Sequence, residues 1–279
     1  MGSLFDGIGG FPLAAVRNGI RPVWASEIES FPIEVTKLRF PNMVHVGDIT
    51  NLNGAELPPV NIICGGSPCQ DLSVAGARAG LAGARSGLFM EQIRIVREMR
   101  NADILRGRTG IHVRPRFLCW ENVPGAFSSG EPKGADFKRV LEEVCGISEE
   151  SVSLPGPPDG AWTPAGIILG QEFSVAWRVL DAQFWGVPQR RRRIFLVADF
   201  AGQSAPEILF EREIVSGDSE PGEAPREGTS GAAAAGTYPA IARSITARYD
   251  GSPCIDRGPN IVFCLQGNGI DRAETAGCN

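Results

Sequence analysis

The first two hundred residues alternate short apolar runs with amphipathic stretches. Short apolar runs bounded by Gly, Pro and polar residues predict β-strands, which we expect at 3–5, 22–26, 44–46, 60–64, 116–121, 175–180 and 193–198. Between them, apolar residues recur every three or four positions and predict helices at 12–18, 31–40, 88–100 and 135–144. This alternation predicts an α/β fold with a doubly wound, mostly parallel sheet covered on both faces.

Two segments depart from this alternation. Residues 151–170 are rich in Pro and Gly and are expected to loop out before the sixth strand. From Ala201 the chain becomes acidic and rich in Gly and Ala, with two strand-like pieces, RSITARY and NIVFCLQG. We therefore expect one α/β domain at 1–201 and a smaller, mostly β or irregular region at 202–279.

The charge of the chain is unevenly distributed. The net charge is −5, and residues 1–200 hold 21 basic and 21 acidic side chains, whereas residues 201–279 hold 6 and 11. Proteins that bind nucleic acid are usually basic. The overall charge therefore argues mildly against nucleic acid, and any such interaction would depend on local basic patches.

Cysteine and histidine usage argues against a disulfide framework or a metal site. The seven cysteines are odd in number, none lies three positions from another, and only two histidines are present. No stretch approaches the roughly 18 consecutive apolar residues that cross a bilayer, and the N-terminus lacks the pattern of a secretory signal. These features favour a protein of a reducing cytoplasm with no metal and no membrane contact.

Three polar features follow the first three predicted strands. The turn LFDGIGGF is glycine-rich and precedes a helix, so its backbone can approach a ligand closely. Glu27 would end the second strand, where an acid can bind a ribose, and Asp48 would end the third, where it can accept from an adenine amino group. Taken singly, each feature also fits a tight turn or a solvated acid. Together they predict a nucleoside site of the kind that S-adenosylmethionine occupies.

Three further motifs reach the same edge of the sheet. NIICGGSPCQDLS places Cys69 beyond the fourth strand, where a thiolate could act as a nucleophile, whereas Cys64 would lie inside the strand. FLCWENVPG places Glu121 and Asn122 at the end of the fifth strand. PQRRRRIF places four arginines immediately before the seventh strand, where they favour an anionic ligand unless they form only a solvated basic turn.

The ordered motifs LFDGIGG, SEIE, GDI, GGSPCQDLS, WENV and PQRRRRIF resemble those of the cytosine-C5 DNA methyltransferases, over about the first 200 residues. The resemblance implies methyl transfer from S-adenosylmethionine to C5 of a cytosine flipped out of duplex DNA. It implies that Cys69 adds to C6 and that Glu121 binds N3 and the exocyclic amine. Arg193 would contact the cytosine O2, and Arg191 would support the site or the DNA backbone.

The resemblance also implies two sets of contact residues. The cofactor shell would comprise Phe5, Gly7, Gly10, Glu27, Ile28, Asp48, Ile49, Pro68, Leu88 and Asn122. The DNA contacts would comprise Gln70, Ser73, Arg78, Arg85 and Gln189. Ile28 stands where many family members have an aromatic residue against the adenine. The glycine-rich stretch 69–87 suits a lid that closes over DNA.

The chain departs from the family pattern after the arginine motif. SITARYDGSPCIDRG resembles the start of a target-recognition region, but no later block or terminal helix follows it. We therefore expect 202–279 to be an incomplete target-recognition region. A complementary C-terminal chain is a further expected partner, and the chain alone should methylate slowly or not at all.

Other functions stay open from the sequence. One is a tRNA cytosine-C5 methyltransferase, and another is an inactive or split fragment. A dinucleotide oxidoreductase fits the sheet but leaves SPCQ, ENV and QRRRR unexplained. A role in restriction-modification and a role in phage self-protection both fit, so the expected location is the cytoplasm of a bacterial or phage-infected cell.

Overall fold

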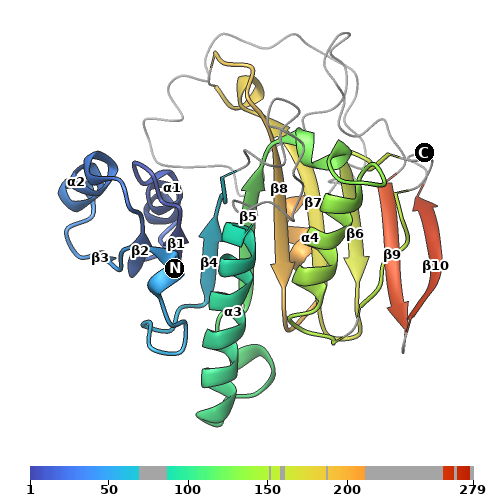
Figure 1. Cartoon of the computed structure of the whole chain (residues 1–279), viewed down its shortest axis with the longest axis horizontal. Helices are drawn as coiled ribbons and strands as arrows, with labels where there is room; N and C mark the ends of the chain where they lie inside the picture. Colours follow the sequence, from blue (N-terminus) through green and yellow to red (C-terminus); the bar gives the residue numbers. More distant parts are fainter. Residues whose placement is uncertain are drawn as a thin grey trace, which may run out of the picture.

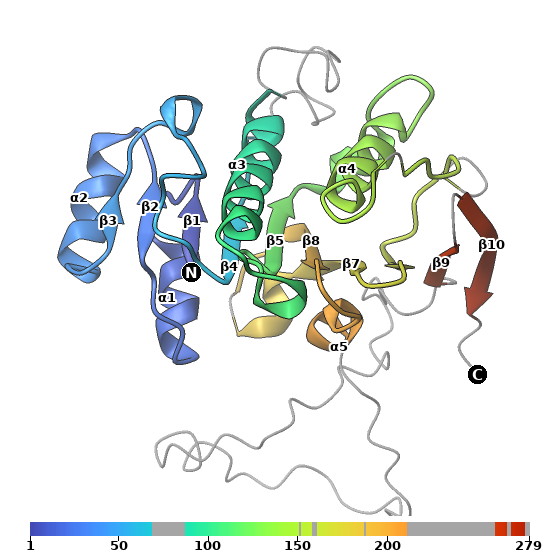
Figure 2. The same cartoon turned by 90° about the horizontal axis from the view of Figure 1, so that it is seen from below.

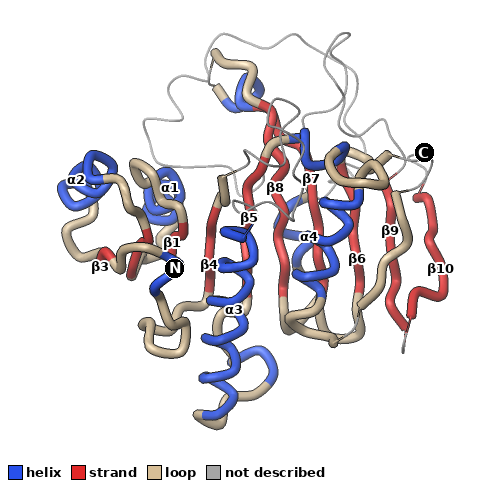
Figure 3. The backbone as a smooth tube through the Cα atoms, viewed as in Figure 1, coloured by secondary structure: helices blue, strands red, loops and turns tan. Residues whose placement is uncertain are grey.

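The computed structural model describes residues 1–68, 87–150, 152–157, 161–186 and 188–210, together with two strands at 260–266 and 269–276. These residues form a ten-stranded sheet with the order β10-β9-β6-β7-β8-β5-β4-β1-β2-β3 (Figure 1). In Figure 3 the strands make one continuous row, with α3 and α4 lying over it. The sheet has a parallel half and a mixed half.

The parallel half contains the first five strands. They are β1 (Gly2–Leu4), β2 (Trp24–Ser26), β3 (Val44–His45), β4 (Ile62–Gly65) and β5 (Phe117–Asn122). All four pairings among these strands are parallel. Their carboxyl ends therefore meet at one edge of the sheet, which is where open α/β sheets bind ligands.

The mixed half continues the sheet beyond β5. Its strands are β6 (Ala165–Leu169), β7 (Ser174–Asp181), β8 (Arg192–Asp199), β9 (Asn260–Gln266) and β10 (Gly269–Ala276). Strand β8 runs antiparallel to β5, with Asn122 opposite Ile194 and Phe117 opposite Asp199. The residues just before β8 consequently lie beside the carboxyl end of β5.

Helices cover both faces of the sheet (Figure 2). On one face lie α3 (Gly87–Leu105) and α4 (Ala135–Cys145), and on the other lie α1 (Gly10–Arg17) and α5 (Ala205–Leu209). Helix α2 (Ser30–Arg39) lies beside the β3 edge. The 3-10 helices are η1 (Ile49–Asn51), η3 (Gly110–His112), η4 (Pro124–Ser128) and η6 (Ala182–Trp185).

The core under α3 and α4 is aromatic. The Phe137 ring lies 5.4 Å from that of Trp162 and 5.7 Å from that of Trp177, centroid to centroid. A Cβ added at Gly166 in β6 would overlap the Trp177 indole on β7. Glycine in β6 therefore lets the indole lie flat against the neighbouring strand.

Most of the predicted elements are present, and the predicted α/β class is confirmed. Each strand and helix predicted within residues 1–200 has a counterpart, although α3 runs five residues further, to Leu105. NIVFCLQG forms β9 as expected, whereas RSITARY lies outside the described residues. The domain division at 201/202 stays a prediction. Helix α5, which follows it, packs Ala205 against Ala176 and Val197 of β7 and β8.

Two strands were not predicted. The expectation that 151–170 loops out is wrong for Ala165–Leu169, which form β6 between β7 and β9. This run is only five residues long and is flanked by Pro164 and Gly170, so its composition indicated a loop. Strand β10, GIDRAETA, lacks an apolar alternation and is held by antiparallel pairing with β9.

Candidate active site

A cavity of about 550 Å³ opens at the carboxyl edge of the parallel strands. It is lined by residues that follow β1, β4 and β5 and by residues at the start of β8. They are Phe5, Asp6, Gly10, Phe11, Ala14, Gly66, Ser67, Glu121, Asn122, Val123, Arg191, Arg193 and Phe195. The cavity thus joins the glycine-rich turn to the predicted acid and both predicted arginines.

The turn after β1 is tied to the end of β2. Phe5 has a positive φ of 54°, as does Gly7, and the amide of Gly7 donates to Oε2 of Glu27 over 2.7 Å. Gly9 also has a positive φ, and a Cβ there would lie 2.7 Å from the Phe40 ring. The sequence folds into this tight turn because glycine tolerates both the conformation and the close approach of α2.

The Glu27 carboxylate organises two backbone segments. Besides the Gly7 amide, it accepts the amides of Ile28 at 2.8 Å and Glu29 at 3.1 Å. A carboxylate offers about four lone-pair sites, so capacity remains for a ligand hydroxyl. Ile28, the neighbour predicted to face an adenine, is 68% exposed.

Asp48 begins the short helix η1. Its Oδ1 accepts the amide and the hydroxyl of Thr50, each at 2.9 Å. The guanidinium of Arg94 on α3 donates to the carbonyls of Ile49 and Leu52, at 3.0 and 2.8 Å. Ile49 itself is buried in the main core. Helix α3 therefore fixes the position of the loop that carries Asp48.

Asp6 is a site residue that the sequence analysis missed. Its carboxyl is 6% exposed, accepts the Ser3 hydroxyl at 2.5 Å on Oδ1 and has no hydrogen-bond partner on Oδ2. Burial raises the pKa of Asp6 to about 6, Ser3 opposes this rise, and the nearby Glu27 adds to it. The available signal was that Asp6 is the one acidic residue inside the glycine turn.

Glu121 lies between two arginines. Its Oε1 is 3.3 Å from Nη2 of Arg191 and 3.4 Å from Nε of Arg193. Strand β5 presents Glu121 and strand β8 presents Arg193, because these two strands are antiparallel neighbours. The predicted acid and the two predicted arginines therefore form one charged cluster.

The backbone of Arg191 is fixed by a buried carboxylate. Asp181 at the end of β7 is 3% exposed and accepts the Arg191 amide at 3.0 Å. The Arg191 carbonyl accepts the amide of Ala182 at 3.1 Å. Gln189, two residues earlier in the motif, is exposed. The main chain of Arg191 is thus hydrogen-bonded to the end of β7 and to the residue that follows it.

A second, more apolar cavity of about 380 Å³ shares part of this cluster. It is lined by Leu180, Ala182 and Trp185 in addition to Glu121, Arg191, Arg193 and Phe195. Trp185 on η6 is 52% exposed. Glu121 and its arginines therefore border both a glycine-rich cavity and an apolar one.

The chain leaving β4 passes directly beside Glu121. A Cβ added at Gly66 would lie 3.6 Å from the Glu121 Cβ, and Ser67 Oγ accepts the Trp120 indole N–H at 3.3 Å. Asn122, predicted in the cofactor shell, is 2% exposed, and its Oδ1 accepts the Val123 amide at 2.7 Å. Strands β4 and β5 thus hold the start of the Cys69 segment against the cluster.

The remaining predicted residues fall into two groups. Pro68 is exposed at the end of the described segment, and Leu88 packs against the core at the start of α3. Five predicted residues lie outside the described residues, namely Cys69, Gln70, Ser73, Arg78 and Arg85. Their roles stay predictions.

The chain belongs to the C-5 cytosine-specific DNA methylase family, whose model matches residues 1–145 and 168–217. It is 35% identical over 236 residues to the DNA N-6-adenine-methyltransferase of Escherichia phage P1. This alignment covers 76% of this chain and 30% of that protein. It is 29% identical over 194 residues to the Type II methyltransferase M.HhaI of Haemophilus parahaemolyticus, covering 70% of this chain and 47% of that enzyme.

Similarity extends to solved structures. A DNA modification methyltransferase encoded within an E. coli prophage aligns with 24% identity and a TM-score of 0.47, covering 71% of this chain and 45% of that one. The chain spans less than half the length of the curated relatives described above.

Two absences concern the described residues alone. Among them, no three His, Cys, Asp or Glu side chains are grouped as metal ligands. No helix within the described ranges is both long and apolar enough to span a membrane.

Proposed function

We propose that this chain carries the catalytic half of a DNA cytosine-C5 methyltransferase that uses S-adenosylmethionine. The observation that carries the proposal is the Glu121 carboxylate, held by Arg191 and Arg193 where two cavities meet. Family membership supports it, because the matched residues include the glycine turn, the SPCQ segment, ENV and the arginine motif.

The strand-end residues fit the cofactor. The ribose hydroxyls would bind Glu27, and the adenine would lie near Asp48 and Ile28. The unpartnered oxygen of the buried Asp6 suits the α-ammonium of the methionine end, since a buried carboxylate needs a cation or a donor. When bound, S-adenosylmethionine supplies an electrophilic methyl group. The glycine turn lets backbone amides approach it.

Cys69 is proposed as the nucleophile. It follows Ser67 by two residues, so the chain can carry it no more than about 7 Å from Ser67. Its thiolate would form a bond to C6 of cytosine while Glu121, carrying a proton on Oε2, gives that proton to N3. Electron density then builds at C5, which would take the methyl group of the cofactor and leave S-adenosylhomocysteine. A water molecule acting as a base would remove the C5 proton as the bond between sulfur and C6 breaks, which frees the Cys69 thiolate, and N3 would return its proton to Glu121.

The two arginines position Glu121 for this role. Both approach the same oxygen, Oε1, which leaves Oε2 to face a base. Arg193 would also reach the cytosine O2, where charge accumulates as the thiolate adds. Duplex DNA would supply the flipped cytosine, and Gln70, Ser73, Arg78, Arg85 and Gln189 are the proposed DNA contacts.

Transfer of a tritiated methyl group to unmethylated duplex DNA tests this function. We expect the slow transfer by the 279-residue chain to disappear in Cys69→Ala and to fall at least about 100-fold in Glu121→Gln. Glu131→Gln, which neutralises an exposed loop acid, is the matched control and should keep the wild-type rate. Transfer that survives Cys69→Ala would remove the nucleophile assignment.

The same assay separates the competing substrates. The phage P1 relative is named as an adenine N6 enzyme, so digested DNA should be analysed for both methylated bases. We expect 5-methylcytosine, and N6-methyladenine would overturn the cytosine assignment. A tRNA substrate added in parallel tests the RNA alternative. Full transfer by this chain alone would contradict the need for a complementary chain.

A further inference from the structure

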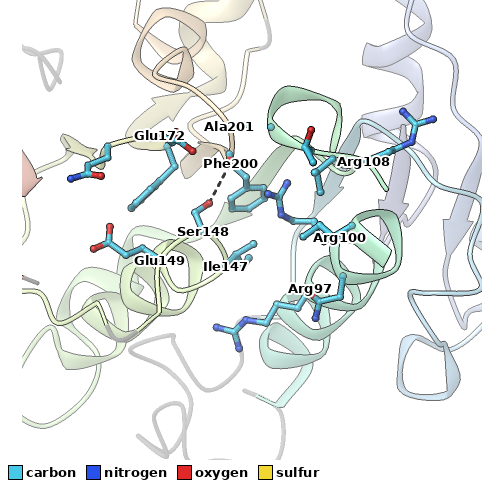
Figure 4. Close-up of a pocket in the computed structure, with 16 residues that line it drawn as sticks. Arg97, Arg100, Arg108, Ile147, Ser148, Glu149, Glu172, Phe200 and Ala201 are labelled. Carbon is cyan, nitrogen blue, oxygen red and sulfur yellow. Dashed lines mark hydrogen bonds between the residues drawn. The ribbon is translucent and has the colours of Figure 1, made fainter. Parts of the chain in front are cut away.

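The cavities of this molecule differ in whether their polar side chains converge. One cavity of about 690 Å³ lies near the start of β5, and Arg97, Arg100 and Arg108 line it (Figure 4). In Figure 4 the side chains of Arg97 and Arg108 extend to opposite sides of Arg100. Their ion-pair partners, Glu143 and Asp103, do not line the cavity. These arginines do not meet at one point, so the cavity defines no ligand.

The apolar cavity of about 380 Å³ beside Glu121 has walls that share one face of the sheet. Phe195 of β8 lies opposite Glu121 of β5, and Leu180 of β7 lies opposite Arg193 of β8. Residues opposite one another in a ladder point to the same face, and so do residues two apart in one strand. All four side chains therefore project to one side of the sheet.

Trp185 lines this cavity from the connection between β7 and β8. Strand β7 runs antiparallel to β8 and thus parallel to β5, so it ends at the edge of the sheet that carries Glu121. In Figure 1 the yellow connection that follows β7 extends beyond the end of β5. Because Trp185 is 52% exposed, a ligand that enters the cavity can lie against its indole ring.

The short helix η6, which carries Trp185, is fixed at its base. The carboxylate of Asp181, the last residue of β7, accepts the backbone amide of Gln183 at 3.3 Å and its side-chain amide at 2.9 Å. The same carboxylate accepts the backbone amide of Arg191 at 3.0 Å. One buried carboxylate thus holds both the helix of Trp185 and the segment of Arg191, which is typical of a pocket formed before its ligand binds.

The lining of this cavity combines an apolar surface with one polar edge. The hydrogen-bonding groups come from Glu121 and its arginines, and the apolar surface comes from Leu180, Ala182, Trp185 and Phe195. A nucleobase has two apolar faces and a polar edge. Enzymes that act on a flipped base hold it by stacking on its faces and by hydrogen bonds to its edge. The cavity therefore matches the shape and polarity of a single base.

We propose that Trp185 stacks on the cytosine that Glu121 binds and holds the base in position for methyl transfer. The proposal rests on the proposed function, because it takes cytosine as the substrate. Glu121 borders both cavities, so a base in the apolar one lies beside the glycine-rich cavity proposed for the cofactor. Trp185 precedes the arginine motif and is not among the residues that the family resemblance implies.

Tryptophan fluorescence can test this contact. All five tryptophans lie within the described residues, and Trp185 alone is exposed, since the others are at most 5% exposed, namely Trp24, Trp120, Trp162 and Trp177. Quenching by acrylamide therefore reports mainly on Trp185. We expect poly(dI-dC) duplex to protect Trp185 from acrylamide and poly(dA-dT), which has no cytosine, to give little protection. The measurement uses Cys69→Ala with S-adenosylhomocysteine, so it records binding without turnover.

Substitutions of Trp185 separate stacking from other effects. Trp185→Phe keeps an aromatic ring and should stay within about threefold of the wild-type single-turnover rate on poly(dI-dC), whereas Trp185→Ala should lose about tenfold or more. Trp185→Phe should also remove the acrylamide-sensitive fluorescence. Ile208→Ala is the matched control, because Ile208 on α5 is 55% exposed and does not line the cavity. It should keep the wild-type rate.

The outcomes separate this contact from the methyl-transfer function. Equal protection by the two duplexes, or protection by neither, would overturn the proposal, because Trp185 would then make no contact specific to cytosine. A wild-type rate in Trp185→Ala, or equal losses in the Phe and Ala variants, would overturn it too. Absence of transfer that depends on Cys69 would contradict the proposed function, and the acrylamide measurement would still decide the contact because it needs no chemistry.

Discussion

The geometry at Glu121 depends on which arginines of the basic run reach it. Arg191 and Arg193 lie two positions apart in the chain, and both approach Oε1 of Glu121. Arg190 is exposed, lies before β8 and forms no ion pair with Glu121. Within the described residues, Arg191 and Arg193 thus contact the acid, whereas no ion pair joins Arg190 or Arg192 to it.

Arg193→Met should lower the rate of methyl transfer by about 100-fold, because a donor aimed at developing charge is worth a few kcal/mol. Arg190→Met removes the same charge from the same run and should leave the rate within about threefold. Single-turnover assays with tritiated cofactor measure both rates. A similar loss in the two variants would mean that the run acts through net charge and not through Glu121.

Under the proposed function, Asp6 should make cofactor binding depend on pH. Its pKa is raised to about 6 in the free chain, mainly by burial, so the carboxylate is largely protonated below that pH. A cationic ammonium binds the ionised form, so affinity should be full above about pH 7 and should fall as the pH drops through 6. Calorimetry with S-adenosylhomocysteine measures this profile.

Asp6→Asn is the control for that profile. The amide cannot ionise, so affinity should be lower at neutral pH and nearly independent of pH between about 5 and 8. A variant that keeps the wild-type slope would assign the pH dependence to another group. Because Glu27 contributes to the raised pKa, Glu27→Gln should shift the midpoint downward.

The positions of individual site residues were predictable only where a sequence motif lies at the end of a predicted strand. Glu27 and Asp48 follow parallel strands and Glu121 lies near the end of one, so their place at one edge followed from the parallel sheet. The sharing of Oε1 by two arginines needed the antiparallel register of β8 on β5, which no local pattern encodes. Asp6 was missed because its importance comes from burial, not from position in a motif.

At the level of elements, the strands that alternate with helices were predictable, and β6 was not. The first five strands are joined by helices or loops whose composition marks their ends. Strand β6 depends on a contact with its neighbour β7, in which the absence of a side chain at Gly166 leaves room for the Trp177 indole. Such a contact is visible only once the two strands are side by side.

Gly166→Ala should therefore destabilise the fold. Its new methyl group would overlap the Trp177 ring, and overpacking of this kind typically costs about 1–3 kcal/mol. Gly156→Ala is the matched control, since a Cβ there meets open space, and should change stability by less than about 0.5 kcal/mol. Urea unfolding followed by tryptophan fluorescence reports both values. Equal stability of the two variants would show that the indole moves at no cost.

Across the whole molecule, buried carboxylates form ion pairs at the end of the sheet where β5 begins and β8 ends. Asp199 at the end of β8 pairs with Arg116 before β5 at 2.8 Å, and Asp103 on α3 pairs with Arg114 at 2.9 Å. Both carboxylates are fully buried. Burial raises the pKa of Asp199, but hydrogen bonds from Arg116, Ser204 and backbone amides outweigh it, so the pKa lies below its usual value.

The stability of the molecule should follow these two aspartates in acid. Burial also raises the pKa of Asp103, yet the hydrogen bonds and charge of Arg114 and the charge of Arg108 lower it overall. A carboxyl whose folded pKa is depressed stabilises the fold above its unfolded pKa, near 3.9, and loses that contribution as the pH falls through the folded value. Asp6 acts in the opposite sense, because its raised pKa favours the folded chain at low pH until about 6.

Asp199→Asn tests this account. At neutral pH it should lower the free energy of unfolding by about 2–4 kcal/mol, since Arg116 loses its buried partner. The difference from the wild type should shrink below about pH 4, where the unfolded chain takes up a proton at Asp199, and should continue to shrink until the pH passes the lower pKa of the folded chain. Glu150→Gln, at an exposed position, should match the wild type throughout. Urea titrations at a series of pH values give the curves, and a difference that stays constant into acid would mean that the packing of Asp199, not its charge, stabilises this edge.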